Sequence, residues 1–388
     1  MFRITKFQLY SMLLLLASPV AYFETPHLLI HNLYNNAWLA AICSVIPGLF
    51  LIYMYSHIIK KSRRPFPLLL DEHLGTIPGR IIGFIYILFF ILVCAYTLRI
   101  FIEFIKMNVL PATPISVFIG VLLFIGFVAI KTGLENIARI CELVIVIGLP
   151  FSFLIVVIAL ANNFHLERIM PIAYMDYRAL GMGTVNSVFV LGKIMPVLSL
   201  AFFLNQKEKA RISMNAFLFT HIPLITLTTL SVIIILGTIP ALSFTFPTFN
   251  MVRLARIGSF IQNLDIIFIG IWITGIFGAV TVPWFMACYT TQQIFNLRDY
   301  RFLAAPSVLI IGVLSIAISR NNVETLVWSI HIIPPLYLFF FIAIPFLIFL
   351  ITLFKPYPEK SSAELAPPPE PTSLNTEGTA PQNQLMSY

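Results

Sequence analysis

The chain has 388 residues, of which 59% are hydrophobic and 10% are charged, with a mean hydropathy of +0.94 and a formal net charge of +8. A soluble globular protein carries roughly 25% charged residues, so a chain of this length and composition could not cover its surface in water. The composition excludes a soluble enzyme, a secreted disulfide scaffold and a disordered protein. It indicates an all-α polytopic membrane protein.

Apolar segments of membrane-spanning length recur along the whole chain. A spanning helix needs about 20 mostly apolar residues, and we predict ten transmembrane helices. They cover residues 8–29, 38–58, 80–105, 115–131, 137–161, 184–204, 213–237, 264–294, 303–319 and 331–354. The first has the length of a signal anchor, but no small-residue cleavage site follows it, so we expect it in the mature protein.

Lys and Arg are distributed unevenly over the loops, and their excess marks the cytoplasmic side. With the N-terminus inside, sixteen basic residues fall on the inner side: Arg3, Lys6, Lys60, Lys61, Arg63, Arg64, Arg80, Lys131, Arg139, Lys207, Lys209, Arg211, Arg298, Arg301, Lys355 and Lys360. Six fall outside: Lys106, Arg168, Arg178, Arg253, Arg256 and Arg320. We therefore predict that both termini are cytoplasmic. Basic residues scattered over separate loops do not indicate nucleic-acid binding.

The last 34 residues differ in composition from the rest. Residues 355–388 hold seven prolines and four glutamates and almost no large aliphatic side chains. Such a segment cannot bury enough apolar surface to fold. We predict a ten-helix transmembrane domain over residues 1–354 and a disordered, Pro-rich cytoplasmic tail over 355–388, with a docking segment as the alternative role of the tail.

Two of the predicted helices contain interruptions near mid-membrane. The first holds Ala17-Ser18-Pro19-Val20-Ala21 and the sixth holds Gly192-Lys193-Ile194-Met195-Pro196. Each could be a simple proline kink or a discontinuous helix whose ends bind a solute. Interruptions in the first and sixth of ten spans have the spacing of a five-plus-five inverted repeat, which favours the binding-site interpretation.

Lys193 is the most informative single residue. A lysine near the bilayer midplane costs roughly 3 kcal/mol on insertion scales. It lies about ten residues from either end of its span, too deep to reach the interface comfortably. It could bind a substrate carboxylate, replace a bound sodium ion or pair with a buried acid.

The remaining intramembrane charges favour structural roles. Arg99 and Glu103 are four residues apart and share a helix face, so they can neutralise each other. Glu135, Arg139 and Glu142 recur at three- and four-residue spacing at the start of the fifth span.

Motifs of covalent or metal chemistry are not apparent in the sequence. Neither a nucleophile–base arrangement nor a GxxxxGKS phosphate loop appears, which argues against a membrane enzyme and against an ATP-driven pump. The four cysteines occur singly in apolar segments, at Cys43, Cys94, Cys141 and Cys288. We therefore expect neither a disulfide framework nor a metal site, and no cofactor.

The loop between spans seven and eight is amphipathic. Apolar residues recur at helical spacing at Phe246, Phe249, Val252, Leu254, Ile257, Phe260 and Ile261, with Arg253, Arg256, Gln262 and Asn263 as the polar counterpart. This pattern predicts a helix that lies in the outer interface or packs over the outer mouth as a lid.

Four features occur together in one known family. They are Ile4-Thr5-Lys6-Phe7-Gln8-Leu9 followed by Pro26 and Ala37-Trp38-Leu39-Ala40; Gly133-Leu134-Glu135-Asn136-Ile137-Ala138-Arg139-Ile140-Cys141-Glu142; Phe246-Pro247-Thr248 through Arg253, Gly258, Phe260, Asp265 and Trp272; and the ten-span count. In these features the chain resembles the spore germination permeases, the B subunits of nutrient germinant receptors, over roughly residues 1–354.

The resemblance implies a fold, partners and a ligand site. The fold is LeuT-like, as in the related amino acid–polyamine–organocation transporters, with helices 1 and 6 broken and the ligand between helices 1, 3, 6 and 8. The implied partners are A-type and lipoprotein C-type subunits in the spore inner membrane. On this basis the candidate ligand-binding residues are Ser18, Pro19, Ala21, Phe89, Val93, Gly192, Lys193 and Gly278.

This chain departs from the family pattern at three places. Ser18, Pro19 and Ala21 replace a Gly-rich break, Gly192-Lys193-Ile194 replaces Gly-x-Glu, and Gln262-Asn263 replace Glu-Arg. The first two departures fall at the pocket, so the resemblance does not identify the ligand.

We therefore expect a germinant-receptor subunit that binds a small nutrient (an amino acid, a sugar or a nucleoside) without covalent chemistry. An amino-acid transporter of the same fold is the first alternative, and a channel-forming or structural subunit with a vestigial cavity is the second.

Overall fold

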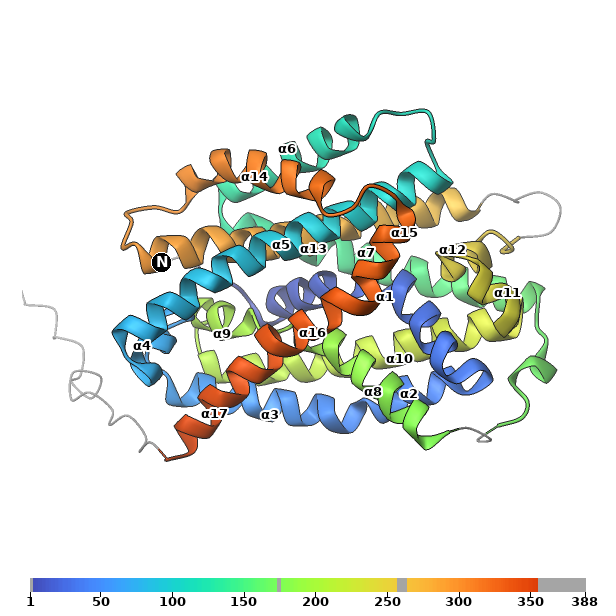
Figure 1. Ribbon diagram of the computed structural model, residues 1–388, viewed down its shortest axis with the longest axis horizontal. Helices are drawn as coiled ribbons and strands as arrows, with labels where there is room; N and C mark the ends of the chain where they lie inside the picture. Colours follow the sequence, from blue (N-terminus) through green and yellow to red (C-terminus); the bar gives the residue numbers. More distant parts are fainter. Residues whose placement is uncertain (1–2, 173–175, 257–263, 355–388) are drawn as a thin grey trace, which may run out of the picture. The chain divides into compact units, whose positions relative to one another are not determined.

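The computed structural model describes residues 3–172, 176–256 and 264–354, and these are helical apart from loops and one isolated bridge between Ile4 and Leu204. In chain order the helices are α1 (Lys6–Leu33), α2 (Ala37–Cys43), α3 (Val45–Lys61), α4 (Leu68–Leu74), α5 (Thr76–Asn108), α6 (Ile115–Thr132), α7 (Leu134–Asn162), α8 (Tyr177–Gly192), α9 (Val197–Leu200), α10 (Ala210–Leu236), α11 (Thr238–Ser243), α12 (Pro247–Val252), α13 (Leu264–Ile294), α14 (Ala304–Ala317), α15 (Asn322–Val327), α16 (Ile333–Tyr337) and α17 (Ile344–Phe354) (Figure 1).

Every predicted span coincides with helical structure. Eight helical runs of the described chain are long and apolar enough to cross a membrane. The first of them, Lys6–Lys61, contains the first two predicted spans, because only a short 3₁₀ turn separates α1 from α2. The ninth span is a shorter apolar helix within Arg301–Ala317. Ten crossings therefore remain a prediction, whereas the helical class is confirmed.

Helix α1 lies at the centre of the packed helices. It contacts α10, α13, α8 and α7, and every residue from Gln8 to Ala21 is buried. The Thr5 side chain accepts a hydrogen bond from the backbone of Gln8, and the Gln8 side chain accepts one from the backbone of Thr5. This capping box fixes where α1 begins.

The predicted break in the first span is wrong, because α1 continues through Pro19 and Pro26. A proline removes the donor for the carbonyl four residues earlier, so Pro26 leaves the Tyr22 carbonyl without its helical partner. The Thr248 hydroxyl, on α12, donates to this carbonyl at 2.7 Å. The Trp272 indole, on α13, donates to the Pro19 carbonyl at 2.7 Å. A neighbouring side chain thus satisfies the carbonyl that Pro26 frees, and α1 remains helical there.

The predicted break in the sixth span is confirmed. Helix α8 ends at Gly192 and α9 begins at Val197, with tight turns between them. Pro196 removes the helical donor to the Gly192 carbonyl, which instead accepts from Met195 N at 3.0 Å. Lys193 therefore lies at the end of a half-helix.

The last span is also irregular, which the sequence analysis did not anticipate. Between α15, α16 and α17 it contains two π-helical turns, Trp328–Ile332 and Leu338–Ala343. Three prolines, Pro334, Pro335 and Pro345, fall near these turns. In Figure 1 the span runs as one long, orange-to-red series of turns from α15 through α16 to α17.

The outer amphipathic segment folds only in part as predicted. Helix α12 covers six residues, Pro247–Val252, and Ile257, Phe260, Ile261, Gln262 and Asn263 lie outside the described residues. Phe246, Phe249 and Val252 are buried, and Phe249 packs edge-on against Phe104 of α5. This burial against protein favours the lid over a helix lying in the interface.

Candidate functional site

Lys193 is buried at the break of the sixth span. Lys193 is 5% exposed, and its ammonium lies over the Tyr337 ring, 5.1 Å from the ring centroid. The ammonium makes no hydrogen bond or ion pair with a residue of the described chain, although it interacts at longer range with Glu24 and His221. A lysine that is buried inside the protein is not snorkelling to the interface.

Glu24 supplies the opposing charge from α1. Its Oε1 accepts hydrogen bonds from the Tyr96 hydroxyl at 2.7 Å and from the Ser329 hydroxyl at 2.9 Å, and those two hydroxyls lie 2.6 Å apart. Our candidate residues do not include Glu24. An acid inside an apolar segment is itself the signal that marks it as a buried functional group.

Tyr337 completes the polar group from the last span. Its hydroxyl is buried and lacks a hydrogen-bond partner among the described residues, and its ring packs against Phe341 at 5.1 Å. We call Glu24, Tyr96, Lys193, Ser329 and Tyr337 the polar cluster. It brings together α1, α5, the end of α8 and the last span.

Three of the predicted ligand-binding residues gather beside the polar cluster. Gly192 and Lys193 form the break itself. A Cβ on Gly192 would lie 3.1 Å from Phe341 Cβ, so this glycine lets the last span approach closely. Phe89 stacks on Phe340 at 4.3 Å and packs edge-on against Phe341 at 4.9 Å.

The other predicted residues pack α1 against its neighbours. Ser18 forms a hydrogen bond of 2.9 Å with His221 on α10, and the Pro19 carbonyl receives Trp272. A Cβ on Gly278 would lie 2.5 Å from Leu15 Cβ, so Gly278 permits a close approach of α13 to α1. Ala21 and Val93 are buried apolar residues.

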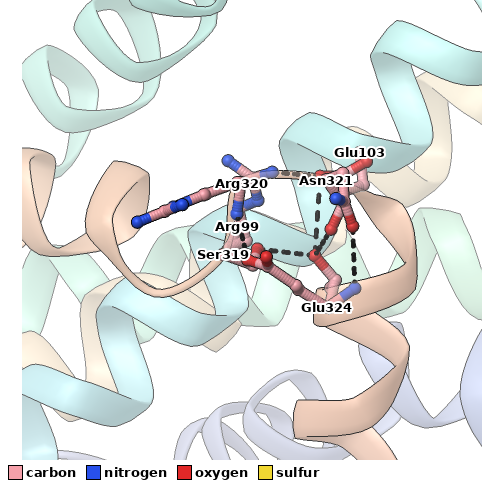
Figure 2. Close-up of polar contacts among 7 residues, drawn as sticks. Arg99, Glu103, Ser319, Arg320, Asn321 and Glu324 are labelled. Atoms are coloured by element: carbon pink, nitrogen blue, oxygen red, sulfur yellow. Dashed lines mark hydrogen bonds and ion pairs between the residues drawn. The ribbon is translucent and has the colours of Figure 1, made fainter.

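A buried ion pair on α5 lies beside the start of the last span (Figure 2). Arg99 and Glu103 form the predicted i,i+4 pair, and both are buried. The Thr325 hydroxyl donates to Glu103 at 3.5 Å and lies 2.6 Å from the Ser319 hydroxyl. Asn321 caps α15 by accepting from the Glu324 backbone at 2.9 Å. Tyr96, Arg99 and Glu103 thus present one polar face of α5 to the last span.

A cavity of about 30 Å³ reaches the polar cluster. Glu24 and Ser329 line it together with Glu103, Thr325 and Asn322. That volume holds one or two water-sized molecules.

The polar cluster has the chemistry of a binding site. Among the described residues, the buried Lys193 ammonium has unused donors and lies over the ring of Tyr337, whose hydroxyl has no partner. An acceptor-rich group such as a carboxylate would satisfy both. Glu24, which lines the cavity, can accept a hydrogen bond from a cationic or hydroxyl donor.

Comparison with solved structures shows that the chain has a LeuT-like fold. MhsT in complex with L-phenylalanine superposes with a TM-score of 0.63, covering 91% of this chain and 98% of MhsT at 10% identity. Mhp1, a nucleobase-cation-symport-1 family transporter in a closed conformation with bromovinylhydantoin bound, gives a TM-score of 0.62, covering 84% of this chain and 74% of Mhp1 at 12% identity. At these identities the likeness shows the fold.

Sequence comparison shows the family. Spore germination protein KB from Bacillus subtilis (strain 168) is 27% identical over 344 residues, which cover 86% of this chain and 91% of the relative. Spore germination protein XB from Bacillus anthracis is 27% identical over 251 residues, which cover 62% and 66% of the two chains. The profile of the family described as spore germination protein matches residues 3–323. The chain belongs to this spore germination protein family.

Proposed function

We propose that the chain is the ligand-sensing membrane subunit of a nutrient germinant receptor, in which a small polar nutrient binds at the polar cluster. The observation that carries this proposal is Lys193, a buried ammonium at a helix break and within electrostatic reach of Glu24. It lies over the ring of Tyr337, whose hydroxyl has no hydrogen-bond partner in the described part of the chain. A buried ammonium without a hydrogen-bonded anionic partner costs free energy, and an anionic ligand group would recover that free energy.

The ligand would act by shifting a helix arrangement rather than by covalent chemistry. The polar cluster joins groups from four elements, so a nutrient that contacts all of them stabilises one arrangement over another. The family membership supports a role in germination, and the nutrient classes we expect are amino acids, sugars and nucleosides. Of these, a nutrient with a carboxylate matches Lys193 best.

Partners and location follow from the same proposal. We place the chain in the spore inner membrane with both termini in the cytoplasm, together with A-type and lipoprotein C-type subunits. The helix shift would pass to those subunits.

A small-molecule transporter of the same fold is the second candidate. MhsT and Mhp1 are transporters with small molecules bound, and the fold is shared with them. Saturable nutrient uptake by this chain alone would favour transport over sensing.

A nutrient screen of spores lacking this chain tests the proposal. Deletion should abolish germination with one nutrient or one nutrient mixture, and the wild-type chain supplied in trans should restore it. Germination by direct chemical triggers that bypass receptors should be unchanged, which controls for spore quality. If deletion spores germinate normally with every nutrient while a single uptake activity is lost, the chain is a transporter and the sensing role is contradicted.

A further inference from the structure

Two irregular segments meet beside the polar cluster, and each contains a carbonyl that has lost its helical donor. Pro196 removes the donor to Gly192 O, and Pro345 removes the donor to Phe341 O. Gly192 O accepts a hydrogen bond from Met195 N at 3.0 Å. A carbonyl without a donor in the bilayer costs free energy, so donors from other helices stabilise such segments.

One hydroxyl from a different helix reaches both carbonyls. The Tyr55 hydroxyl, on α3, donates to Phe341 O at 2.5 Å and lies 3.4 Å from Gly192 O. Tyr55 is fully buried. On α5, the Tyr86 hydroxyl donates to the adjacent carbonyl, Phe340 O, at 2.5 Å.

These bonds lie next to the two groups proposed to hold the nutrient. Lys193 follows Gly192 in the chain, and Tyr337 precedes Phe341 by one turn and packs against it. Tyr55 therefore fixes the break that carries Lys193 relative to the π-helical turn that follows Tyr337. The Lys193 ammonium lies over the Tyr337 ring only while these two segments keep that relation.

We propose that Tyr55 is a positioning residue for the nutrient pocket, and that Tyr86 supports it by holding the same π-helical turn. This inference rests on the proposed function, because it assumes that Lys193 and Tyr337 contact the nutrient. Tyr55 itself does not touch the ligand. It acts by setting the distance and direction between the ammonium and the Tyr337 hydroxyl.

The test replaces Tyr55 by Phe, which removes the hydroxyl and keeps the ring. Tyr53→Phe is the matched control, because Tyr53 lies on the same helix and is 49% exposed. Germination is measured against nutrient concentration and normalised to receptor abundance. Tyr55→Phe should raise the half-maximal nutrient concentration about three- to tenfold, as expected for one hydrogen bond, and Tyr53→Phe should leave it unchanged.

A double-mutant cycle separates positioning from a general structural role. If Tyr55 acts through Lys193, then Tyr55→Phe should cause little further shift in a Lys193→Met background. The positioning role would be overturned if the shifts of the two single variants multiply in the double variant. It would also be overturned if the Tyr55→Phe curve is unshifted while the Lys193→Met curve is shifted. Either result would leave the proposed function intact. Unshifted curves for both single variants would contradict the proposed function as well.

Tyr86→Phe keeps the inference testable if Tyr55→Phe does not reach the membrane. It should shift the curve in the same direction and also lose its effect when Lys193 is Met. Absence of both Phe variants from the membrane would show that the hydroxyls are needed for folding, which would overturn the positioning role.

Discussion

A single lysine offers a test of whether the polar cluster binds a ligand. Lys193 is buried, and its ammonium makes no hydrogen bond or ion pair among the described residues, so its burial costs free energy. Lys193→Met keeps the length and the apolar stem and removes the charge. We predict that the protein inserts normally while the half-maximal nutrient concentration rises about 10- to 100-fold, since a hydrogen bond to a charged group contributes about 1.5–3 kcal/mol.

The control for charge loss is Lys131→Met. Lys131 is exposed at the end of α6 and lies over the Phe127 ring at 5.7 Å, far along the chain from the cluster. Dose–response curves normalised to abundance should be unchanged for this variant. A normal curve for Lys193→Met at normal abundance would remove the lysine from the site, and lost protein would indicate a structural pair instead.

Glu24 offers a test of the electrostatics inside the cluster. Glu24→Gln keeps an acceptor for Tyr96 and Ser329 but leaves Lys193 without an opposing charge. We predict a loss of unfolding free energy on the order of 2 kcal/mol, from two charges several ångströms apart at an effective dielectric constant near 20. Thermal unfolding of the purified protein in detergent measures it.

Two further variants identify the cause of that loss. Glu24→Gln combined with Lys193→Met should recover the stability, because no buried charge is then left uncompensated. Glu135→Gln should have little effect, because the Glu135–Arg139 pair, at 2.6 Å, is exposed to solvent. An unrecovered double variant would show that the two residues are not coupled.

The sequence predicted part of this site, for a physical reason. A buried lysine and a helix break can be recognised in the sequence, because a charge and a proline are unusual within an apolar run. Tyr337 and Ser329 did not stand out, because hydroxyl-bearing residues are common in membrane helices. Their role depends on which helices meet, and that information lies in the packing.

At the scale of elements, proline positions predicted bends better than breaks. Pro19 and Pro196 looked equivalent in sequence, yet α1 is continuous and the sixth span is broken. In α1 the Thr248 hydroxyl of another helix donates to the Tyr22 carbonyl that Pro26 frees, and the helix continues. In the sixth span the chain closes tight turns between Gly192 and Pro196. Such partners cannot be predicted from spacing alone.

The bond from Thr248 to α1 gives a prediction for the lid. Thr248→Val keeps the shape of this buried side chain and removes the donor to the Tyr22 carbonyl, which Pro26 already deprives of its helical partner. We expect the free energy of unfolding to fall by about 1–2 kcal/mol, measured by thermal unfolding in detergent. Thr248→Ser retains the hydroxyl and should lose less than half as much. Equal losses in the two variants would point to the methyl group rather than the hydrogen bond.

At the scale of the whole molecule, the helical class and the approximate spans follow from composition and hydropathy. The LeuT-like arrangement was expected from the resemblance and is confirmed by the likeness to MhsT and Mhp1. Hydropathy could not show that the first two spans form one nearly continuous run, or that the last span carries two π-helical turns. Those features depend on hydrogen bonds between helices.

The orientation in the membrane is the last prediction, and it rests on the loop charges. Residues 59–79 contain four basic residues in a compact run, Lys60, Lys61, Arg63 and Arg64, so this loop should be cytoplasmic and the loop at 238–263 external.

Cysteines introduced at exposed positions that carry no charge, Thr76→Cys and Ser243→Cys, test this orientation with a membrane-impermeant thiol reagent. The background should carry Cys43→Ser, because Cys43 is the exposed cysteine among the four. In intact cells Ser243→Cys should react at once, and Thr76→Cys should react only after permeabilisation. The reverse pattern would invert the topology, and it would place the cavity beside Glu24 on the cytoplasmic side, out of reach of an external nutrient.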